Sequence, residues 1–268
     1  MIIEPVLCAR QLVKRFGGIV ALDRADFDLA PGQIVAVVGE TGSGRTALLQ
    51  SLAGALAPEA GEIKLDGHPL VFHDPAEAWA VGIEMAQQRP ALVPGLSFAE
   101  NLFLGREVRR AGMLGQIGRM LDRRHMRDMA IATAESLGIA GTIDIDQPVE
   151  RLSRVERRLL SLARAAAFAS RVVIADEPTE GLDAAGTSRV LDVILEVRAR
   201  GLSIVLAAQN LPHVFELVDR IHIQRLGRRL CVVDPAYATP SDVAAMISGT
   251  AGPRPDMLVP MHRAAAPA

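Results

Sequence analysis

The chain has 268 residues, of which 50% are hydrophobic and only 3% aromatic, so we expect one large domain with an aliphatic core. A formal net charge of −2 gives no electrostatic reason to expect a nucleic-acid partner. No apolar run approaches the roughly 18 residues of a membrane-spanning helix, and the polar residues Glu4 and Arg10 near the start argue against a secretion signal. The widely separated Cys8 and Cys231 favour reduced thiols in a reducing compartment.

Residues 4–30 alternate polar and apolar positions around two turn signals, which predicts two or three antiparallel strands. Phe16 stands beside the first of these turns, Gly17-Gly18. Its aromatic ring suits two roles, that of a core side chain or that of a platform on which an adenine ring stacks.

A glycine-rich loop follows the apolar run 33–38 and precedes an Ala/Leu-rich helical run, which is the strand–loop–helix context of a phosphate-binding loop. Its residues are Gly39, Glu40, Thr41, Gly42, Ser43, Gly44, Arg45 and Thr46. The glycines allow successive N–H groups to turn inward and form an anion-binding cradle, and Thr46 offers a hydroxyl for Mg²⁺. However, the pattern GxxxxGK[ST] has lysine where Arg45 stands, and the two cations are not equivalent. Taken alone, the loop could also be a tight connection without a ligand.

The middle of the chain carries several helix and strand signals. Residues 61–72 predict two short strands, and Asp74 and Ser97 each begin a helix-capping pattern. The segment from Gly82 runs as a strand into a loop that contains Gln88. Residues 103–150 have a helical period with arginines on one side, which favours a solvated helix face over a nucleic-acid contact.

Four apolar residues from Val172 lead directly to two acids, Asp176 and Glu177. Carboxylates at the end of a buried strand are costly unless they face a cation or a polar site. We therefore interpret Asp176 as a Mg²⁺-linked residue and Glu177 as a group that orients water or acts as a general base. The alternative is that the two acids only begin a surface turn.

The last third of the chain continues the alternation of helices and strands. Asp183 caps a predicted helix over 184–200, and a strand over 203–207 leads to Gln209. A helix at 212–218, a strand pair around Gly227 and a helix capped by Thr239 follow, and the Ala/Pro-rich residues 250–268 predict a disordered tail.

In this order, the phosphate-type loop, Gln88, Leu152-Ser153, Val172–Glu177 and Gly181–Asp183 resemble an ATP-binding cassette (ABC) subunit over about residues 5–249. The stretches 92–107 and 212–220 look closest to the carbohydrate-importer branch, in its single-cassette fructose- or ribose-type form. The resemblance implies an α/β fold, namely a P-loop NTPase cassette with a mainly parallel core sheet, an N-terminal antiparallel β subdomain and an α-helical subdomain. It places the ATP-binding domain at 1–249 and its helical subdomain at about 97–165.

The resemblance also implies roles for individual residues. Phe16 would stack on adenine, residues 39–46 would hold the phosphates, and Gln88 would sense metal and water. Asp176 would hold Mg²⁺ through water, with Thr46 and Gln88 as the other metal-linked residues, and Glu177 would polarise the attacking water. Ser153 would contact the nucleotide from the signature helix, and Gln209 stands at the switch position.

The implied cofactors are ATP and Mg²⁺. The implied partners are transmembrane permease subunits, a second cassette in a head-to-tail dimer and, indirectly, a periplasmic sugar-binding protein. The implied location is peripheral, on the cytoplasmic side of the inner membrane.

Three departures from the family pattern affect groups that would touch the γ-phosphate. Arg45 replaces lysine, and Gln209 replaces histidine. The signature reads Leu-Ser-Arg-Val-Glu over 152–156, where the family has Leu-Ser-Gly-Gly-Gln, or Leu-Ser-Val-Gly-Gln in the sugar branch. Val155 adds bulk where a close approach is needed, and Glu156 sets a carboxylate near an anion. Arg154 could compensate by supplying positive charge, as an arginine finger does. Two functions follow: an ATPase subunit of a sugar importer with impaired turnover, or a catalytically weak or inactive cassette that partners a competent one.

Overall fold

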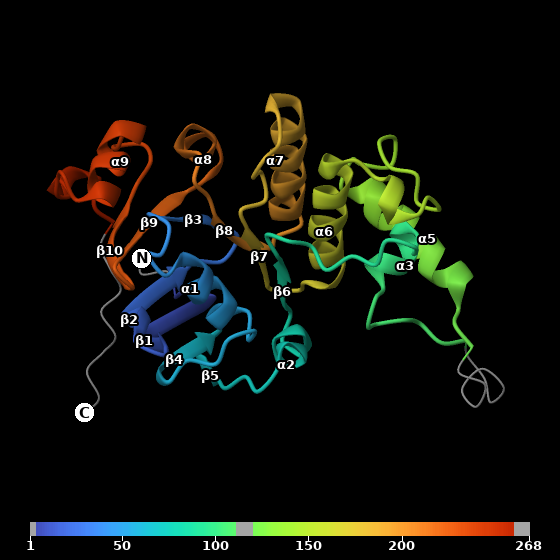
Figure 1. Ribbon diagram of the computed structural model, residues 1–268, viewed down its shortest axis with the longest axis horizontal. Helices are drawn as coiled ribbons and strands as arrows, with labels where there is room; N and C mark the ends of the chain where they lie inside the picture. The colour runs from blue at the N-terminus through green and yellow to red at the C-terminus, as the bar shows by residue number, and fades with distance from the viewer. Residues whose placement is uncertain (1–3, 111–119, 260–268) are drawn as a thin grey trace. The chain divides into compact units, whose positions relative to one another are not determined.

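The computed structural model describes residues 4–110 and 120–259. The chain divides into two compact units, one formed by Met1–Met85, Ala169–Glu177 and Gly201–Ala268, the other by Ala86–Phe168 and Pro178–Arg200. Figure 1 shows that the strands gather in the first unit and that the second is mainly helical. The expected helical part, residues 97–165, lies within the second unit.

The first unit begins with an antiparallel sheet of four strands in the order β2-β1-β4-β5. The strands are β1 (Leu7–Phe16), β2 (Ile19–Leu29), β4 (Ala60–Leu65) and β5 (His68–Leu70). Alternate side chains of β1 and β2 are buried, as the polar–apolar alternation of residues 4–30 predicts. The expected strand pair in residues 61–72 is confirmed as β4 and β5.

A second sheet of the first unit has the strand order β10-β9-β3-β8-β7-β6. The strands are β3 (Ile34–Val38), β6 (Ile83–Ala86), β7 (Val172–Asp176), β8 (Ser203–Ala207), β9 (Arg220–Arg225) and β10 (Arg228–Val233). β3 pairs in parallel with both β8 and β9, and β7 pairs in parallel with β8. Every residue of β3, β7 and β8 is buried, which explains their continuous apolar sequences. The carboxyl ends of these three strands consequently meet at one edge of the sheet, the usual place for a ligand in such folds.

Aliphatic side chains from both sheets form one core around α1 (Arg45–Leu52). Leu48, Leu49 and Leu52 are fully buried, and Phe27 is the largest side chain of this core. The first unit also contains α2 (Pro75–Ala80), α8 (Leu211–Leu217) and α9 (Pro240–Ser248), and Figure 1 shows α8 and α9 near β9. The expected aliphatic core is confirmed.

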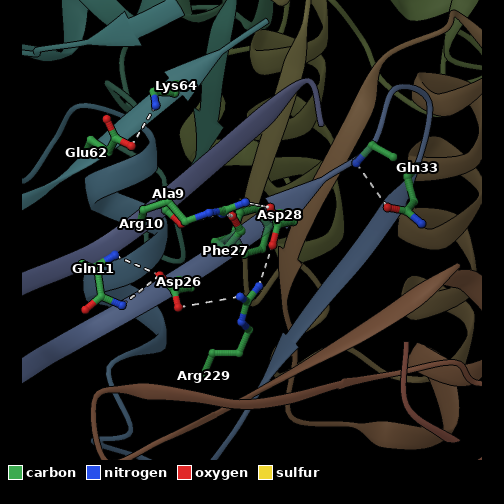
Figure 2. A network of polar contacts seen from close by, with 11 residues as sticks. Ala9, Arg10, Gln11, Asp26, Phe27, Asp28, Gln33, Glu62, Lys64 and Arg229 are labelled. Carbon is green, nitrogen blue, oxygen red and sulfur yellow. Dashed lines mark hydrogen bonds and ion pairs between the residues drawn. The ribbon is translucent and has the colours of Figure 1, made fainter. Parts of the chain in front are cut away.

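An ion-pair network also joins the two sheets of this unit (Figure 2). The Asp28 carboxylate on β2 binds Arg10 of β1 through one oxygen and the Arg229 Nη1 atom of β10 at 2.7 Å through the other. Asp26 accepts a hydrogen bond from Gln11 N–H at 2.9 Å and lies 3.7 Å from Arg229 Nη2. Only 6% of the Arg229 side chain is exposed, so this contact is better shielded from solvent than most pairs on the surface.

Four helices form the second unit (described part) and pack against one another. They are α3 (Phe98–Leu102), α5 (Arg123–Ser136), α6 (Arg154–Phe168) and α7 (Ala184–Ala199), with the short 3₁₀ turn η1 (Val149–Arg151) before α6. Ser97 and Asp183 cap α3 and α7 as predicted. The helical expectation for 103–150 is too broad, because α5 is the only α-helix within its described residues, and 137–148 form turns and irregular structure before η1.

The C-terminal segment differs from the expected tail as far as residue 259. Here η2 (Pro255–Met257) follows α9, the Met257 side chain is 2% exposed, and Val259 N–H donates to the Val232 carbonyl of β10 at 3.0 Å. Apolar residues in an Ala/Pro-rich context thus pack on a sheet edge, while residues 260–268 lie outside the described part. Within the described ranges, no helix combines the length and the apolar character that crossing a bilayer requires.

Candidate nucleotide-binding site

The loop between β3 and α1 needs glycine at two positions because other backbone atoms lie where a side chain would be. A Cβ atom on Gly39 would lie 2.2 Å from the Gln224 carbonyl oxygen and 2.5 Å from Ser43 Oγ. Gly44, with φ +95°, would place a Cβ atom 2.2 Å from the Ala21 carbonyl oxygen. Both contacts are too close for any other residue, so the tight path of the loop depends on the glycines.

The same loop presents polar groups that suit a phosphate. Glu40, Thr41 and Gly42 are exposed, and Gly44 precedes α1 without offering a side chain that could cap its first N–H groups. Ser43 Oγ is buried and makes no hydrogen bond within the described part of the chain. An oxygen-rich anion would satisfy such groups at a helix N-terminus, so these residues fit the phosphates of a nucleotide.

Arg45, in contrast, turns to groups of its own chain. Its Nη1 atom lies 3.1 Å from Glu177 Oε1 and donates a hydrogen bond to the Ala208 carbonyl oxygen at 3.1 Å. The Arg45 and Glu177 side chains are 9% and 8% exposed, so solvent screens this ion pair only weakly. One guanidinium therefore connects the start of α1 with the carboxyl ends of β7 and β8.

Glu177 occupies an unusual backbone position directly after β7. Its φ angle is +49°, a left-handed value that non-glycine residues adopt rarely, and its N–H donates to the Ala207 carbonyl oxygen at 3.1 Å. Asp176, the last residue of β7, is 4% exposed. The expected apolar strand ending in two acids is confirmed, and neither acid lies on an exposed surface turn, since both are buried.

Three other predicted site residues of the first unit are solvent-accessible. Gln209 follows Ala208 and is exposed, as is Thr46 in the first turn of α1. Phe16 is 50% exposed, with Lys14 Nζ 5.8 Å from its ring centroid, so the core interpretation of Phe16 is wrong. An exposed ring at the end of β1 remains free to stack on a flat ligand.

Gln88 and its neighbours form a small polar cluster in the second unit. Gln88 Nε2 donates to Glu180 Oε2 at 3.0 Å, and Arg158 donates to the Gln88 carbonyl oxygen. Arg158 Nη2 also lies 3.5 Å from Glu180 Oε2. The Gln88 side chain thus has a specific protein partner, which nothing in its sequence context indicates.

The altered signature begins α6 with a reciprocal cap. Ser153 N–H donates to Glu156 Oε2 at 2.6 Å, and Glu156 N–H donates to Ser153 Oγ at 3.2 Å. Arg154 Nη1 donates to the Gly181 carbonyl oxygen at 2.9 Å. Val155 lies close to α7, since a Cβ atom on Gly186 would be 2.6 Å from its Cγ2 atom. The residues that replace the glycines and glutamine of the family pattern thus make contacts inside their own unit.

Sequence reasoning missed three of these relationships. The pairing of Arg45 with Glu177 has no local signal, because the two residues are far apart in the sequence. The same holds for the Gln88–Glu180 contact. The Ser153–Glu156 cap does have a signal, the pattern S-x-x-E, which also correctly predicts the cap at Ser97.

Known proteins resemble this chain over most of its length. A model of the ABC transporter family matches residues 22–180. Fructose import ATP-binding protein FrcA of Rhizobium meliloti is 52% identical over 250 residues, which cover 93% of this chain and 96% of the relative. Ribose import ATP-binding protein RbsA 2 of Rubrobacter xylanophilus is 35% identical over 245 residues, or 91% of this chain and 46% of the relative. The chain thus spans about half the length of this ribose-import relative.

Solved structures share the fold at low sequence identity. A nucleotide-free ATP-binding cassette from an ABC transporter matches with a TM-score of 0.76 and 20% identity, covering 94% of this chain and 97% of that one. An ATP-binding cassette of an ABC transporter in its ADP conformation matches with a TM-score of 0.73 and 20% identity, covering 91% and 95%. These likenesses confirm the expected P-loop cassette fold. Together with the family match and the full-length relative, they show that the chain belongs to the ABC transporter family.

Proposed function

We propose that this chain is the ATP-binding subunit of an ABC importer that takes up a sugar, with fructose as the first candidate. The observation that carries the proposal is the 52% identity to a fructose import ATP-binding protein over nearly the full length of both chains. The glycine loop before α1, with the two buried acids at the end of a strand in the same sheet, supports ATP as the ligand. We also propose residues 1–249 as the ATP-binding domain.

In this proposal the loop residues 39–46 hold the phosphates through backbone N–H groups, and Phe16 stacks on the adenine ring. Hydrolysis forms a bond between the water oxygen and the γ-phosphorus. The bond between the γ-phosphorus and the β–γ bridging oxygen breaks, and that oxygen leaves with ADP. Glu177 accepts a hydrogen bond from the attacking water and receives its proton. Gln88 and Gln209 contact the water or the γ-phosphate, and Ser153 contacts the nucleotide of a partner cassette.

Magnesium fits the donor set of the first unit. Within the described residues, no group of three or more His, Cys, Asp or Glu side chains could hold a metal ion by itself. Mg²⁺ is commonly held by one or two carboxylates together with substrate phosphates. We propose Asp176 and Thr46 as the metal-linked residues of this unit and Gln88, from the second unit, as a further one, and the ion would neutralise charge on the phosphates.

We further propose that turnover is slow. Gln209 cannot carry the positive charge that a histidine brings to a developing transition state. The planar guanidinium of Arg45 is not equivalent to the compact ammonium of lysine, and the N-terminus of α6 is already capped by Glu156. Each feature lowers the electrostatic support available to the γ-phosphate, while the backbone cradle for binding stays intact.

The proposed partners are two permease subunits that span the membrane, a second cassette and, through the permease, a periplasmic sugar-binding protein. The proposed location is peripheral, on the cytoplasmic face of the inner membrane. The names of the relatives, which are import ATP-binding proteins, support partners of this kind.

The test has a biochemical and a cellular arm. Purified protein should bind a fluorescent ATP analogue saturably, and Glu177→Gln should keep binding while phosphate release falls by about 10²-fold or more. Deleting the gene in its native host should reduce uptake of labelled fructose, and the wild-type gene should restore it. No saturable binding at millimolar nucleotide and magnesium would exclude the ATPase, and unchanged fructose uptake would exclude that sugar.

A further inference from the structure

We propose that Arg45 is a positioning residue that holds Glu177 until a nucleotide phosphate displaces it, so that ATP must break a buried ion pair in order to bind. The inference rests on the proposed ATP-binding function and adds one step to it, the loss of the Arg45–Glu177 ion pair when the nucleotide binds. The pair joins the glycine loop, which would receive the phosphates, to the acid that would handle the water.

The geometry shows that the pair holds Glu177 in place. Arg45 Nη1 lies 3.1 Å from Glu177 Oε1 in an ion pair and donates a hydrogen bond to the Ala208 carbonyl oxygen at 3.1 Å, so one guanidinium nitrogen contacts both groups. Glu177 has a left-handed backbone with φ +49°, which usually persists only where surrounding contacts enforce it. The N–H bond of Glu177 to the Ala207 carbonyl is one such contact, and the ion pair to Arg45 is another.

The Glu177 carboxylate and the phosphates of the nucleotide compete for the positive charge of the Arg45 guanidinium. Its Nη2 and Nε atoms could still donate to a phosphate, but a cation neutralised by a carboxylate attracts an anion far less than an unpaired one. Both side chains are less than 10% exposed, so water does little to weaken their attraction. A triphosphate that draws on the Arg45 charge therefore weakens the attraction between Arg45 and Glu177.

Two consequences follow for the proposed reaction. Before nucleotide enters, the Glu177 carboxylate faces Arg45, with its Oε1 atom 3.1 Å from Arg45 Nη1. Once the phosphates take over the guanidinium, Arg45 no longer holds the Glu177 carboxylate, which can then turn toward water. Nucleotide entry and the release of Glu177 are in this way the same event.

A double-mutant cycle on nucleotide affinity tests this exchange. The dissociation constant of N-methylanthraniloyl-ATP is measured by fluorescence, without magnesium, for wild type, Arg45→Met, Glu177→Gln and the double variant. If the pair breaks on binding, wild type binds more weakly than the single variants predict. The product of the wild-type and double-variant constants should then exceed the product of the two single-variant constants by about tenfold.

The control is the exposed pair of Arg171 and Asp66, whose atoms lie 3.3 Å apart in the same unit. Its cycle, with Arg171→Met and Asp66→Asn, should give a ratio near one. Circular dichroism checks that each variant is folded, and Arg45→Gln replaces Arg45→Met if the latter is not.

The outcomes separate the inference from the proposed function. Saturable binding with a ratio within twofold of one, or below one, would show that Arg45 keeps Glu177 in the complex, and it would overturn the inference alone. If none of the four proteins binds the nucleotide, both the inference and the proposed function are rejected. A ratio well above one, absent from the control cycle, supports the exchange.

Discussion

Ser153 and Glu156 satisfy each other's backbone at the start of α6. Glu156 Oε2 accepts from Ser153 N–H at 2.6 Å, while Ser153 Oγ accepts from Glu156 N–H at 3.2 Å. A carboxylate also interacts favourably with the positive end of the helix dipole. Two of the N–H groups that this helix N-terminus would offer to an incoming anion, those of Ser153 and Glu156, are therefore already used by the chain itself.

Truncating Glu156 should remove this cap. We expect Glu156→Ala to lower the free energy of unfolding by about 1 kcal/mol, whereas Glu156→Gln should lose much less because glutamine also completes such a cap. Urea denaturation followed by circular dichroism measures both. Glu135→Ala, at an exposed position on α5, should change stability by less than about 0.5 kcal/mol. Equal losses for Glu156→Ala and Glu135→Ala would contradict a capping role.

The capping patterns show how far local sequence information reaches. The sequence predicts that Ser97 and Thr239 cap helices, and both do so through reciprocal bonds with the acid three residues later. Ser153 and Glu156 follow the same capping pattern. The sequence interpretation compares them only with the glycine-rich signature of the family, and the cap is therefore missed. The order of strands and helices is likewise predictable, because apolar runs and alternation reflect burial directly.

The contacts between distant segments are not predictable in this way. Arg45 and Glu177 are each identifiable as site residues, yet no pattern in the sequence indicates that they pair, since only the fold brings α1 and β7 together. The family resemblance predicts that Gln88 senses metal and water, and this stays a prediction, but no sequence pattern indicates that its side chain donates to Glu180. The helical period of residues 103–150 extends well beyond the helix α5 that forms there, because apolar spacing alone does not specify where turns interrupt a helix.

The stability cost of replacing Gly181 should depend on the Arg154 side chain. A Cβ atom on Gly181 would lie 2.5 Å from Arg154 Nη1, and the φ angle of +69° disfavours any side chain. We expect Gly181→Ala to lower the free energy of unfolding by about 1 to 2 kcal/mol, and by only about 1 kcal/mol when Arg154 is also alanine.

The matched control for this prediction is Gly138→Ala. Gly138 has φ +68°, and a Cβ atom added to it would meet no described atom within 4 Å, so its loss should equal the backbone part alone and should not depend on Arg154. Urea denaturation of the single and double variants gives all the values. If Gly181→Ala costs the same in both backgrounds, the Arg154 contact contributes nothing.

His222 should make the protein less stable in mild acid. Burial, the largest effect, together with the nearby Arg229 lowers the pKa of His222 from 6.5 to about 4, against the opposing effects of its hydrogen bond to Gln224 and of Asp26. In the unfolded chain the imidazole takes up its proton near pH 6.5, so between about pH 6.5 and 4 the unfolded state binds more protons. Stability is therefore complete above this window and falls as the pH falls through it, by at most about 3 kcal/mol.

Urea denaturation at pH 7.5 and pH 5 tests the effect of His222. We expect His222→Gln to lose part of the pH dependence that wild type shows between these values. His125→Gln, which changes an exposed histidine on α5, should keep the wild-type dependence. An unchanged difference between pH 7.5 and pH 5 in His222→Gln would show that His222 is not the group responsible.

Gln209 offers the clearest test of why turnover should be slow. Gln209 is exposed and directly follows Ala208, whose carbonyl oxygen accepts a hydrogen bond from Arg45. Glutamine can donate a hydrogen bond to a phosphate oxygen, but a histidine can also carry positive charge when negative charge develops. We expect Gln209→His to raise the maximal rate of phosphate release by about tenfold, with little change in ATP affinity, because only the transition state gains the added support.

Asn210→His makes the same chemical change at the neighbouring exposed residue and should leave the rate at the wild-type level. Equal rates for the two variants, or a wild-type turnover already within about 1 to 10³ s⁻¹, would show that the glutamine does not limit this enzyme.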